Sequence, residues 1–262
     1  MNMSIRRIYA ITLKLFASSL TVAKVFEDIY WPSMDILLMG MTGMWVQGIQ
    51  STAKPYALAM LTGAVLWQIS LRAYFSIAVN ILDEFFARNF VNLFSTPLKL
   101  SEWIIGAVIL STARSLFVLF VGWIIAWLVY GQSILSIGFM LIPLYLLMLM
   151  FGLSLGFLGS SILFVYGQKI QAIVWALSWF FAPFCGVFYP MEVLPGWMQV
   201  IGYSMPATYV LESMRSLMYS GTISYTMLGK ALCLNILYLS LGLALFVYTF
   251  ERSRNKGLSR LE

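Results

Sequence analysis

The chain has 262 residues, of which 61% are hydrophobic and 10% are charged, and its mean hydropathy is +0.88. Soluble domains are typically about 45–50% apolar and about 25% charged, so this composition excludes an ordinary soluble domain as well as a disordered chain. The 16 basic residues exceed the 10 acidic ones, but they do not form a nucleic-acid-binding patch, and histidine is absent. The sequence therefore predicts an all-α polytopic membrane protein without a metal site or a nucleic-acid partner.

The first predicted element is an amphipathic helix over residues 5–28. Apolar residues such as Ile8, Ile11 and Leu15 recur at helical spacing along one face. Its other face carries Arg7, Lys14, Thr21, Lys24 and Asp28. A basic amphipathic helix of this kind suits the plane of the membrane interface, where its cations meet lipid headgroups. A solvated N-terminal helix is the alternative interpretation.

Six apolar segments follow, and each is predicted to be a transmembrane helix. Tyr30, Trp31 and Pro32 precede the first and are typical of an interfacial anchor and a helix start. Three residues separate the third segment from the fourth, so these two helices are expected to form a tight antiparallel hairpin. Gly152 and Gly156 on the fourth segment predict close contact with another helix. The six segments are residues 33–50, 56–82, 103–130, 134–165, 170–188 and 226–250.

The distribution of basic residues orients these segments. With the N-terminus on the cytoplasmic side, six spans return the tail, residues 251–262, to the same side. Eleven basic residues then lie in cytoplasmic segments, whereas Lys54, Arg215 and Lys230 lie outside. The positive-inside rule therefore predicts a protein of the cytoplasmic (inner) membrane with both termini in the cytoplasm. The eleven are Arg6, Arg7, Lys14, Lys24, Arg88, Lys99, Lys169, Arg252, Arg254, Lys256 and Arg260.

The cytoplasmic connection, residues 83–102, is too long and too patterned for a simple turn. Phe86, Phe90 and Phe94 follow one another at intervals of four residues, which is typical of one face of a helix. The polar positions between them are Arg88, Asn89 and Asn92. This pattern predicts a short amphipathic helix over residues 83–94.

The external connection, residues 189–225, is broken by prolines into two apolar pieces, residues 197–203 and 208–219. Each piece is too short to span a membrane. Such pieces suit re-entrant helices, whose broken backbone is tolerated where it is buried in protein. The alternative is that the prolines only shape a loop.

Motifs for catalysis are missing from the sequence. It contains no phosphate-binding loop, no nucleophile elbow, no Cys-x-x-Cys pair and no histidine motif. No catalytic residue and no cofactor bound by this chain are therefore predicted, and ATP and Mg²⁺ would belong to another subunit. Energy for uphill transport would come from an ion gradient or from a partner ATPase.

Apart from Lys230 near the external end of the sixth segment, three charged residues lie within the predicted spans: Asp35, Arg72 and Arg114. Asp35 is near the start of its segment, whereas both arginines lie about 15 Å deep at 1.5 Å per residue. Two arginines at matched depth on neighbouring helices would repel unless they face water, lipid phosphates or an anionic substrate. Both are candidates for the transport pathway, with snorkelling or structural hydrogen bonding as the alternative.

Aromatic side chains, 16% of the chain, supply the other candidates for the pathway. They recur near helical spacing in the fifth apolar segment and accompany the predicted helices of the external connection. Packing or an interfacial belt is the competing interpretation of such a stripe. The candidates are Trp175, Trp179, Phe184, Trp197, Tyr203 and Tyr209.

The order of these parts resembles the permease subunit of ABC-2 type transporters, the membrane half of exporters for drugs, lipids and glycans. Residues 86–110 read FARNFVNLFSTPLKLSEWIIGAVIL and resemble the family's cytoplasmic stretch with its "TPL…W…G" pattern. Residues 180–221 resemble its signature around the last external loop, at Gly186, Tyr189, Pro190, Leu194, Pro195, Trp197, Pro206, Thr208 and Arg215. One departure is that residues 83–88 are less charged than the family's usual Glu-Arg-Glu-Arg-Gly.

The resemblance implies a separate ABC ATPase (nucleotide-binding) subunit, with two permeases and two ATPases in the complex. Residues 83–94 would then be the main coupling helix, and residues 167–171 a smaller contact with the ATPase. It also implies export of an amphipathic, hydrophobic or lipid-linked substrate, such as a drug, a lipid or a glycan, among membrane lipids. The coupling residues would be Arg88, Asn89, Phe90, Asn92, Phe94, Gln168 and Lys169.

Two other functions stay open. An ion-coupled secondary transporter would use intramembrane ionisable groups, although no Asp/Glu proton relay accompanies the two arginines in the predicted spans. A membrane-embedded enzyme would need a carboxylate or tyrosine site, for which Glu192 and Glu212 are the external acidic candidates.

Overall fold

The computed structural model describes residues 3–49 and 55–256, and all regular secondary structure within these two ranges is helical. The predicted all-α class is therefore confirmed. Lys54, Arg260 and the end of the predicted tail lie outside the described residues. The elements are α1 (Ile5–Ser19), α2 (Val22–Ile49), α3 (Tyr56–Phe86), α4 (Phe90–Ser95), α5 (Leu100–Tyr130), η1 (Ile134–Met140), α6 (Leu141–Tyr166), η2 (Gly167–Ile170), α7 (Gln171–Phe180), η3 (Met191–Val193), α8 (Gly196–Tyr203), α9 (Pro206–Ser220) and α10 (Tyr225–Asn255).

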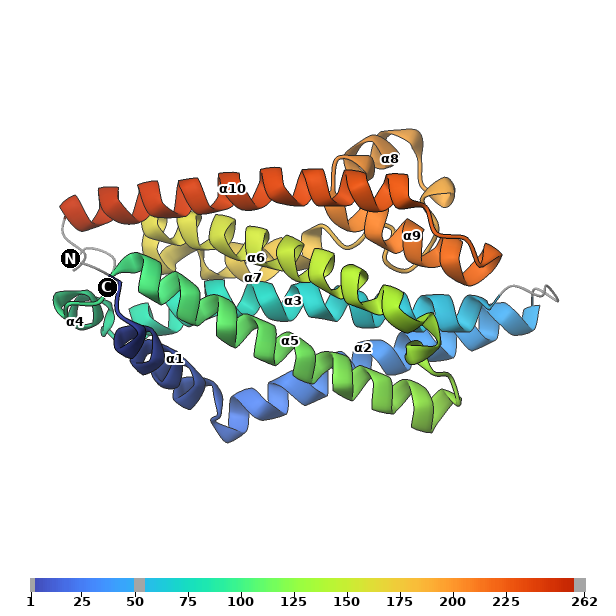
Figure 1. Cartoon of the computed structure of the whole chain (residues 1–262), viewed down its shortest axis with the longest axis horizontal. Helices are drawn as coiled ribbons and strands as arrows, with labels where there is room; N and C mark the ends of the chain where they lie inside the picture. The colour runs from blue at the N-terminus through green and yellow to red at the C-terminus, as the bar shows by residue number, and fades with distance from the viewer. Residues whose placement is uncertain (1–2, 50–54, 257–262) are drawn as a thin grey trace.

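The long helices run side by side along the longest axis of the molecule (Figure 1). At one end lie α4, the start of α1 and the end of α10, and at the other lie α8 and α9. Contacts agree with this view, since the backbone N–H of Ser4 donates to Glu102 and the rings of Phe94 and Phe250 lie 4.7 Å apart. We call these the α4 end and the α8 end.

The predicted count of six spans is not confirmed. Four helices among the described residues are long and apolar enough to cross a membrane: α3, α5, η1 with α6, and α10. A fifth span is obtained if α1 and α2, which meet at an angle of 72°, are taken together as one broken span. The protein is thus a multi-pass membrane protein with four or five candidate spans.

The fifth predicted segment, residues 170–188, is not one helix. Its helix α7 has only 10 residues, about 15 Å, which is half of a hydrocarbon core. Beyond it the chain turns irregularly, because Pro183 has no N–H to continue the helix and Gly186 takes a left-handed conformation with φ of 65°. This segment approaches the α8 end as a half-helix followed by turns.

The N-terminal prediction also needs correction. The helix predicted over residues 5–28 ends at Ser19, and α2 runs without a break from Val22 through Pro32. The proline lies buried inside α2 rather than at its start. The bend therefore precedes Lys24 and Asp28, which belong to the same straight helix as the first apolar segment.

The cytoplasmic connection is likewise divided differently from the prediction. Helix α3 continues to Phe86, so that Asp83 and Glu84 belong to it, and α4 starts only at Phe90. Arg88 lies in the turn between them with φ of 49°. The predicted helix over residues 83–94 is thus the end of one long helix, a turn and a separate helix of 6 residues.

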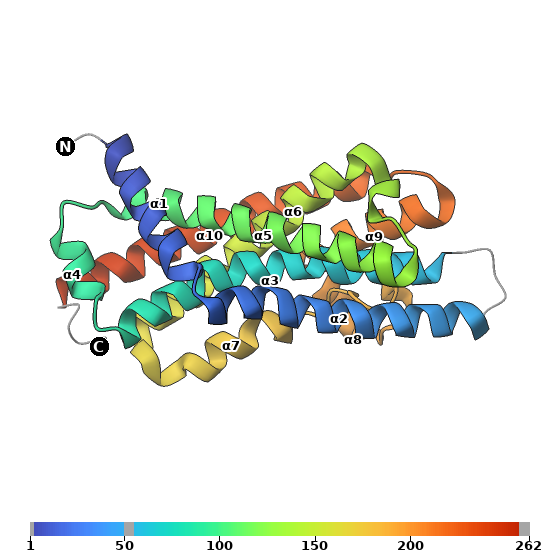
Figure 2. The same ribbon diagram turned by 90° about the horizontal axis from the view of Figure 1, so that it is seen from below.

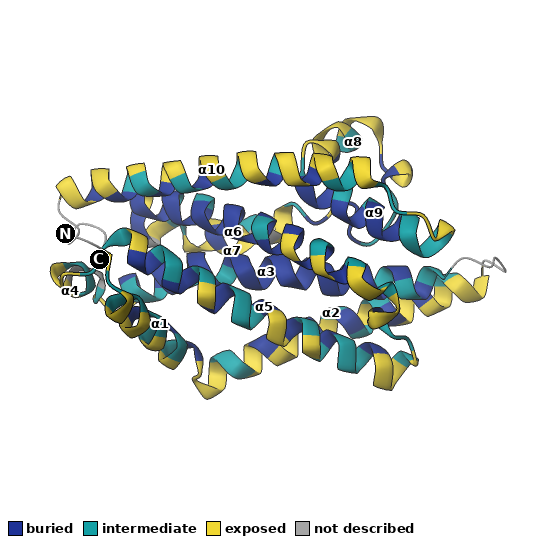
Figure 3. Ribbon diagram, in the orientation of Figure 1, coloured by how far each residue is buried: buried dark blue, intermediate teal, exposed yellow. Residues whose placement is uncertain are grey.

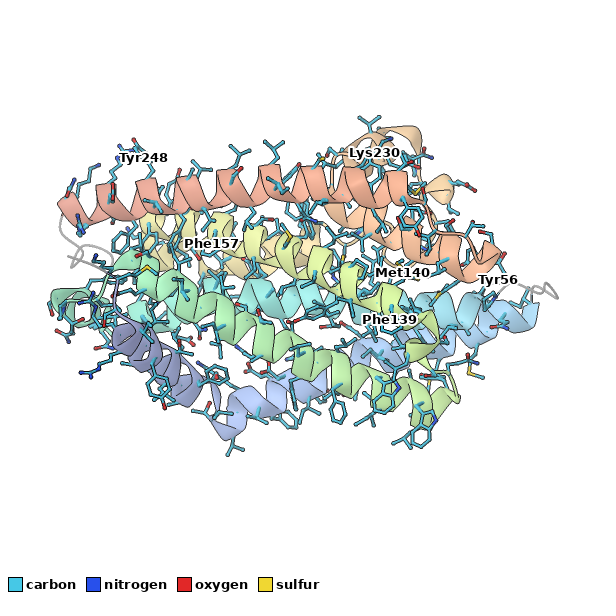
Figure 4. The ribbon with its side chains drawn as sticks, in the orientation of Figure 1. Tyr56, Phe139, Met140, Phe157, Lys230 and Tyr248 are labelled. Atoms are coloured by element: carbon cyan, nitrogen blue, oxygen red, sulfur yellow. The ribbon has the colours of Figure 1, made fainter. Side chains whose placement is uncertain are left out.

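Helix α3 is the centre of the bundle (Figure 3). Of its most apolar stretch 89% is buried, against 22% for α10, which lies at the edge. In Figure 4, Phe157 of α6 lies between α6 and α10, whereas Tyr248 points outward from α10. The core therefore forms around α3, with α5, α6 and α2 as its main neighbours.

The glycines of α6 permit this close packing. A Cβ atom added to Gly152 would lie 2.7 Å from Ala73 Cβ and even closer to the carbonyl oxygen of Ser70. A Cβ at Gly156 would lie 3.0 Å from Ile77 Cβ. The small-residue face predicted on this segment is thus confirmed as a contact surface, and its partner is α3.

Candidate functional site

A cluster of three charged side chains joins α2, α3 and α5. Arg72 donates from Nη1 to Oδ1 of Asp28 at 2.7 Å. Arg114 donates from Nε to Oδ2 at 2.8 Å and from Nη2 to Oδ1 at 2.6 Å of the same carboxylate. Asp28 is 5% exposed and Arg72 is also 5% exposed, so this carboxylate is the buried counter-charge of both guanidinium groups.

The two arginines occupy matched positions. Arg72 lies 14 residues before the end of α3, and Arg114 lies 14 residues after the start of α5. At 1.5 Å per residue both are about 21 Å from the α4 end, well inside the bundle. The matched depth predicted from the sequence is therefore present, but the repulsion is relieved by Asp28 and not by solvent or lipid alone.

A cavity of ≈ 450 Å³ lies beside this cluster, and this volume is within the range of about 300–1,000 Å³ that is typical of small-molecule sites. Its lining comes from α2, α3, α5 and α7, and Figure 2 shows α2 and α7 on the same side of α3. Four of the eight predicted pathway residues line it: Arg72, Arg114, Trp175 and Trp179. Its complete lining is Lys24, Glu27, Trp31, Arg72, Phe75, Val79, Asn80, Asp83, Arg114, Trp175 and Trp179.

The aromatic side chains that line the cavity contact its charged side chains. Phe75 lies between them, with its ring 5.2 Å from the ring of Trp175 and 5.6 Å from Cζ of Arg72. Trp175 and Trp179 are four residues apart on α7 and so share one helix face. They are 45% and 41% exposed, which leaves surface of both indoles available to a ligand.

A second polar pair lies one step further along the same two helices. The amide nitrogen of Gln68 donates to Oδ2 of Asp35, while its amide oxygen is buried without a hydrogen-bond partner among the described residues. Gln68 and Arg72 are four residues apart on α3, and Asp28 and Asp35 are seven apart on α2. Each helix therefore presents a polar stripe to the other.

The other four pathway candidates gather at the α8 end, apart from the cavity. The rings of Phe184 and Trp197 are 6.3 Å apart, and those of Tyr203 and Tyr209 are 5.9 Å apart. Partial burial and the nearby carboxylates of Glu212 and Glu192 raise the pKa of Tyr203, so its phenol stays protonated as a hydrogen-bond donor. The predicted pathway residues thus form two groups.

Arg215 holds the α8 end together. It donates to Oε1 of Glu212 at 2.7 Å and to the carbonyl oxygens of Gly186 and Val187, the latter at 3.2 Å. Glu212 also accepts the backbone N–H of Met191 at 3.0 Å. This network accounts for Gly186 and Arg215 in the external signature, and it engages Glu212 in structural bonds. The observed α8 and α9 confirm the two short helical pieces predicted there.

At the α4 end the predicted coupling residues differ in exposure. Arg88, Asn92 and Lys169 are exposed, whereas Asn89 donates to Oε2 of Glu84 at 2.9 Å. Phe94 packs against Phe250 and so attaches α4 to α10. The side chains of Phe90 and Gln168 lie outside the described residues. The exposed set is the part of this group that is free to meet another subunit.

Ion pairs fasten α1 and α2 to the same end. Glu102, fully buried, accepts from Arg7 Nη2 at 2.8 Å, and Lys24 Nζ lies 2.7 Å from Oδ2 of Asp83. Lys14 pairs with Glu84, the residue that also holds Asn89. The basic face predicted for the N-terminal helix is therefore directed largely at acidic residues of α3 and α5.

Asp28 is the site residue that the sequence prediction missed. The sequence places it on the polar face of an interfacial helix, so that no proton relay of Asp and Glu residues is predicted to accompany the two arginines. One signal was present, since two arginines at equal depth require a counter-charge. Within residues 3–49 and 55–256 no group of three His, Cys, Asp or Glu side chains is placed to hold a metal ion.

A helical bundle with several membrane-spanning helices, an internal charged cavity and a short helix at one end defines a multi-pass membrane component with a ligand-sized site. The sequence profile of the ABC-2 type transporter family matches residues 5–219, and the chain belongs to that family. It is therefore the membrane component of an ABC transporter and not itself the ATPase. A comparison with individual curated proteins gave no match.

Proposed function

We propose that this chain is the permease subunit of an ATP-driven exporter that moves an amphipathic, hydrophobic or lipid-linked substrate out across the cytoplasmic membrane. A separate ABC ATPase subunit supplies the energy, and a second copy of the chain completes the membrane part. The family match over residues 5–219 is the observation that carries the proposal. In this arrangement the α4 end faces the cytoplasm.

The position of α4 supports a coupling role. It connects the end of α3 with the start of α5, and these two helices bring Arg72 and Arg114 to Asp28 of α2. Because helices move as rigid bodies, a push on α4 is transmitted to both arginines together. Movement at the ATPase contact would thus change the walls of the cavity.

The test of this proposal is association with the ATPase. The variant is Arg88→Glu/Asn92→Glu, which reverses one charge and adds another at exposed positions of the α4 end. It should lower the amount of ATPase subunit that co-purifies with the chain about tenfold or more. The control is Lys230→Glu, a charge reversal on the exposed face of α10 near the α8 end, which should retain it. Full retention by the double variant would contradict the coupling role.

Energy supply and orientation are tested separately. Transport should require ATP and the ATPase subunit, and transport that persists without any ATPase but stops with an ionophore would instead support a secondary transporter. For orientation, Arg88→Cys and Lys230→Cys are made in a Cys233→Ser background, because Cys233 is exposed and Cys185 is buried. An impermeant thiol reagent should label position 230 from outside and position 88 only from inside.

A further inference from the structure

When direct ion pairs are counted, the cavity between α2, α3, α5 and α7 keeps one positive and one negative side chain in excess. Lys24 and Asp83 form an ion pair with each other. Arg72 and Arg114 share the single carboxylate of Asp28. Glu27, which also lines the cavity, has no ion-pair partner among the described residues. The formal charges therefore sum to zero, yet Glu27 makes no direct ion pair with either guanidinium among the described residues and acts on Arg72 only at longer range.

The positive group has spare hydrogen-bond donors. Nε of Arg72 is buried and has no hydrogen-bond partner within the described part of the chain. Two guanidinium groups offer ten N–H donors between them, and only three of their nitrogens donate to Asp28. An anionic group of a ligand, with several acceptor oxygens, would satisfy donors that one carboxylate leaves unused.

The negative group stands among aromatic rings. Glu27 is exposed on the same cavity as Trp31, Trp175 and Trp179. A carboxylate combined with indole faces is the chemistry that binds ammonium groups, including quaternary ones. The cavity thus offers one region for an anion, at the arginines, and another for a cation, at Glu27 and the tryptophans.

We propose that this cavity binds a zwitterionic amphiphile, with its phosphate-type anion at Arg72 and Arg114 and its ammonium at Glu27. This inference rests on the proposed function, because it names the class of substrate that the permease would accept. The volume of ≈ 450 Å³ accommodates a small head group, and the apolar body lies along Phe75 and Val79. The cavity walls therefore complement a ligand that carries one positive and one negative charge, rather than a ligand with a net negative charge.

The experiment is calorimetric titration of the purified full-length chain in dodecyl maltoside, a non-ionic detergent. The probes are octylphosphocholine, octyl phosphate and octyltrimethylammonium, which share a chain and differ in head-group charge. Octylphosphocholine should bind about tenfold more tightly than either singly charged probe. Equal or weaker binding of the zwitterion would overturn the proposal.

Two variants assign the ends of the ligand. Glu27→Gln should remove the preference for octylphosphocholine over octyl phosphate, and Arg114→Gln should remove its preference over octyltrimethylammonium. Arg114→Lys should keep the latter preference, since it keeps the charge. Glu192→Gln and Arg252→Gln, which make the same changes at exposed positions outside the cavity, should bind like the unaltered chain. Because Glu27 is exposed, its variant does not depend on a buried bond for folding, and an unchanged preference in Glu27→Gln would overturn the assignment.

A further probe separates a lipid-type ligand from a soluble head group. Free phosphocholine should bind about tenfold more weakly than octylphosphocholine, because it lacks the apolar chain. Equal binding would overturn the amphiphilic part of the proposal. All these titrations use the chain without an ATPase. A failed ATPase association with intact zwitterion selectivity would therefore refute the proposed function and leave the binding site, but not its role in transport, standing.

Discussion

The two faces of α3 differ in how they meet their neighbours. One face packs against α6, where Gly152 and Gly156 bring the backbones together without space for a side chain. The other face carries Gln68, Arg72 and Asp83 and meets α2 across polar pairs and a cavity. The first contact depends mainly on shape, with one buried hydrogen bond from Ser70 Oγ to the carbonyl oxygen of Met148. The second depends on charges that must be matched.

This difference indicates which parts can move relative to each other. A glycine seam has no alternative packing of similar energy, because any shift exposes voids or creates clashes. An ion cluster beside a cavity can exchange partners with a ligand. We therefore expect α3 and α6 to behave as one rigid unit, and α2 with α7 to be the elements that adjust around a substrate.

The largest effect is expected from Asp28→Ala. This change leaves two buried guanidinium groups without their counter-charge, which should lower the free energy of unfolding by about 3–5 kcal/mol. The measurement is a denaturant titration of the purified protein. Asp83→Ala, which breaks a more exposed pair, is the control and should cost less than about 1 kcal/mol. Equal losses in both variants would show that the cluster is no more important than a surface pair.

An intermediate effect is expected from Gly152→Val. The new side chain would collide with Ala73 and with the backbone at Ser70, so overpacking should cost about 1–3 kcal/mol. Gly229→Val on α10 is the matched control, because no atom lies within 4 Å of a Cβ there. If both variants unfold at the same denaturant concentration, the α3–α6 seam is not the rigid contact described above.

The smallest effect is expected from Lys14→Gln, which removes the pair with Glu84 at the α4 end. Both side chains are partly exposed, at 35% and 12%, so the loss should be about 1 kcal/mol or less. The loss should shrink further when salt is raised, since exposed pairs are screened at high ionic strength. Thermal unfolding at low and high salt measures it, and a large salt-independent loss would place this pair with the Asp28 cluster instead.

Local patterns predicted those elements whose causes lie within a few residues. The helical pieces α8 and α9 and the glycine face of α6 follow from prolines and small residues in the sequence. The tight hairpin expected of α5 and α6 is not formed, because η1 separates the two helices and α6 packs mainly on α3 and α10. The grouping of Arg72, Arg114, Trp175 and Trp179 was also anticipated in part, as candidates for one pathway. The helical pieces and the glycine face are properties that a short window of sequence contains, whereas these four pathway residues are brought together only by the fold.

The errors arose where distant residues decide the local structure. Pro32 and its aromatic neighbours indicated a helix start, but the helix continues upstream because Lys24 and Asp28 find partners on α3 and α5. The fifth predicted segment has the hydrophobicity of a span, but its second half is fixed as turns by Arg215, 28 and 29 residues away along the chain. Hydrophobicity alone does not distinguish a helix from a buried irregular segment.

The sequence by itself determined that the chain is an all-α membrane protein of the ABC-2 type transporter family, because composition, spacing and signature residues are local properties. Only the tertiary structure decided where its buried charges meet. Asp28 reaches Arg72 across 44 residues and Arg114 across 86. A buried charge needs a partner wherever the fold supplies one, and which residue that is depends on how α2, α3 and α5 pack.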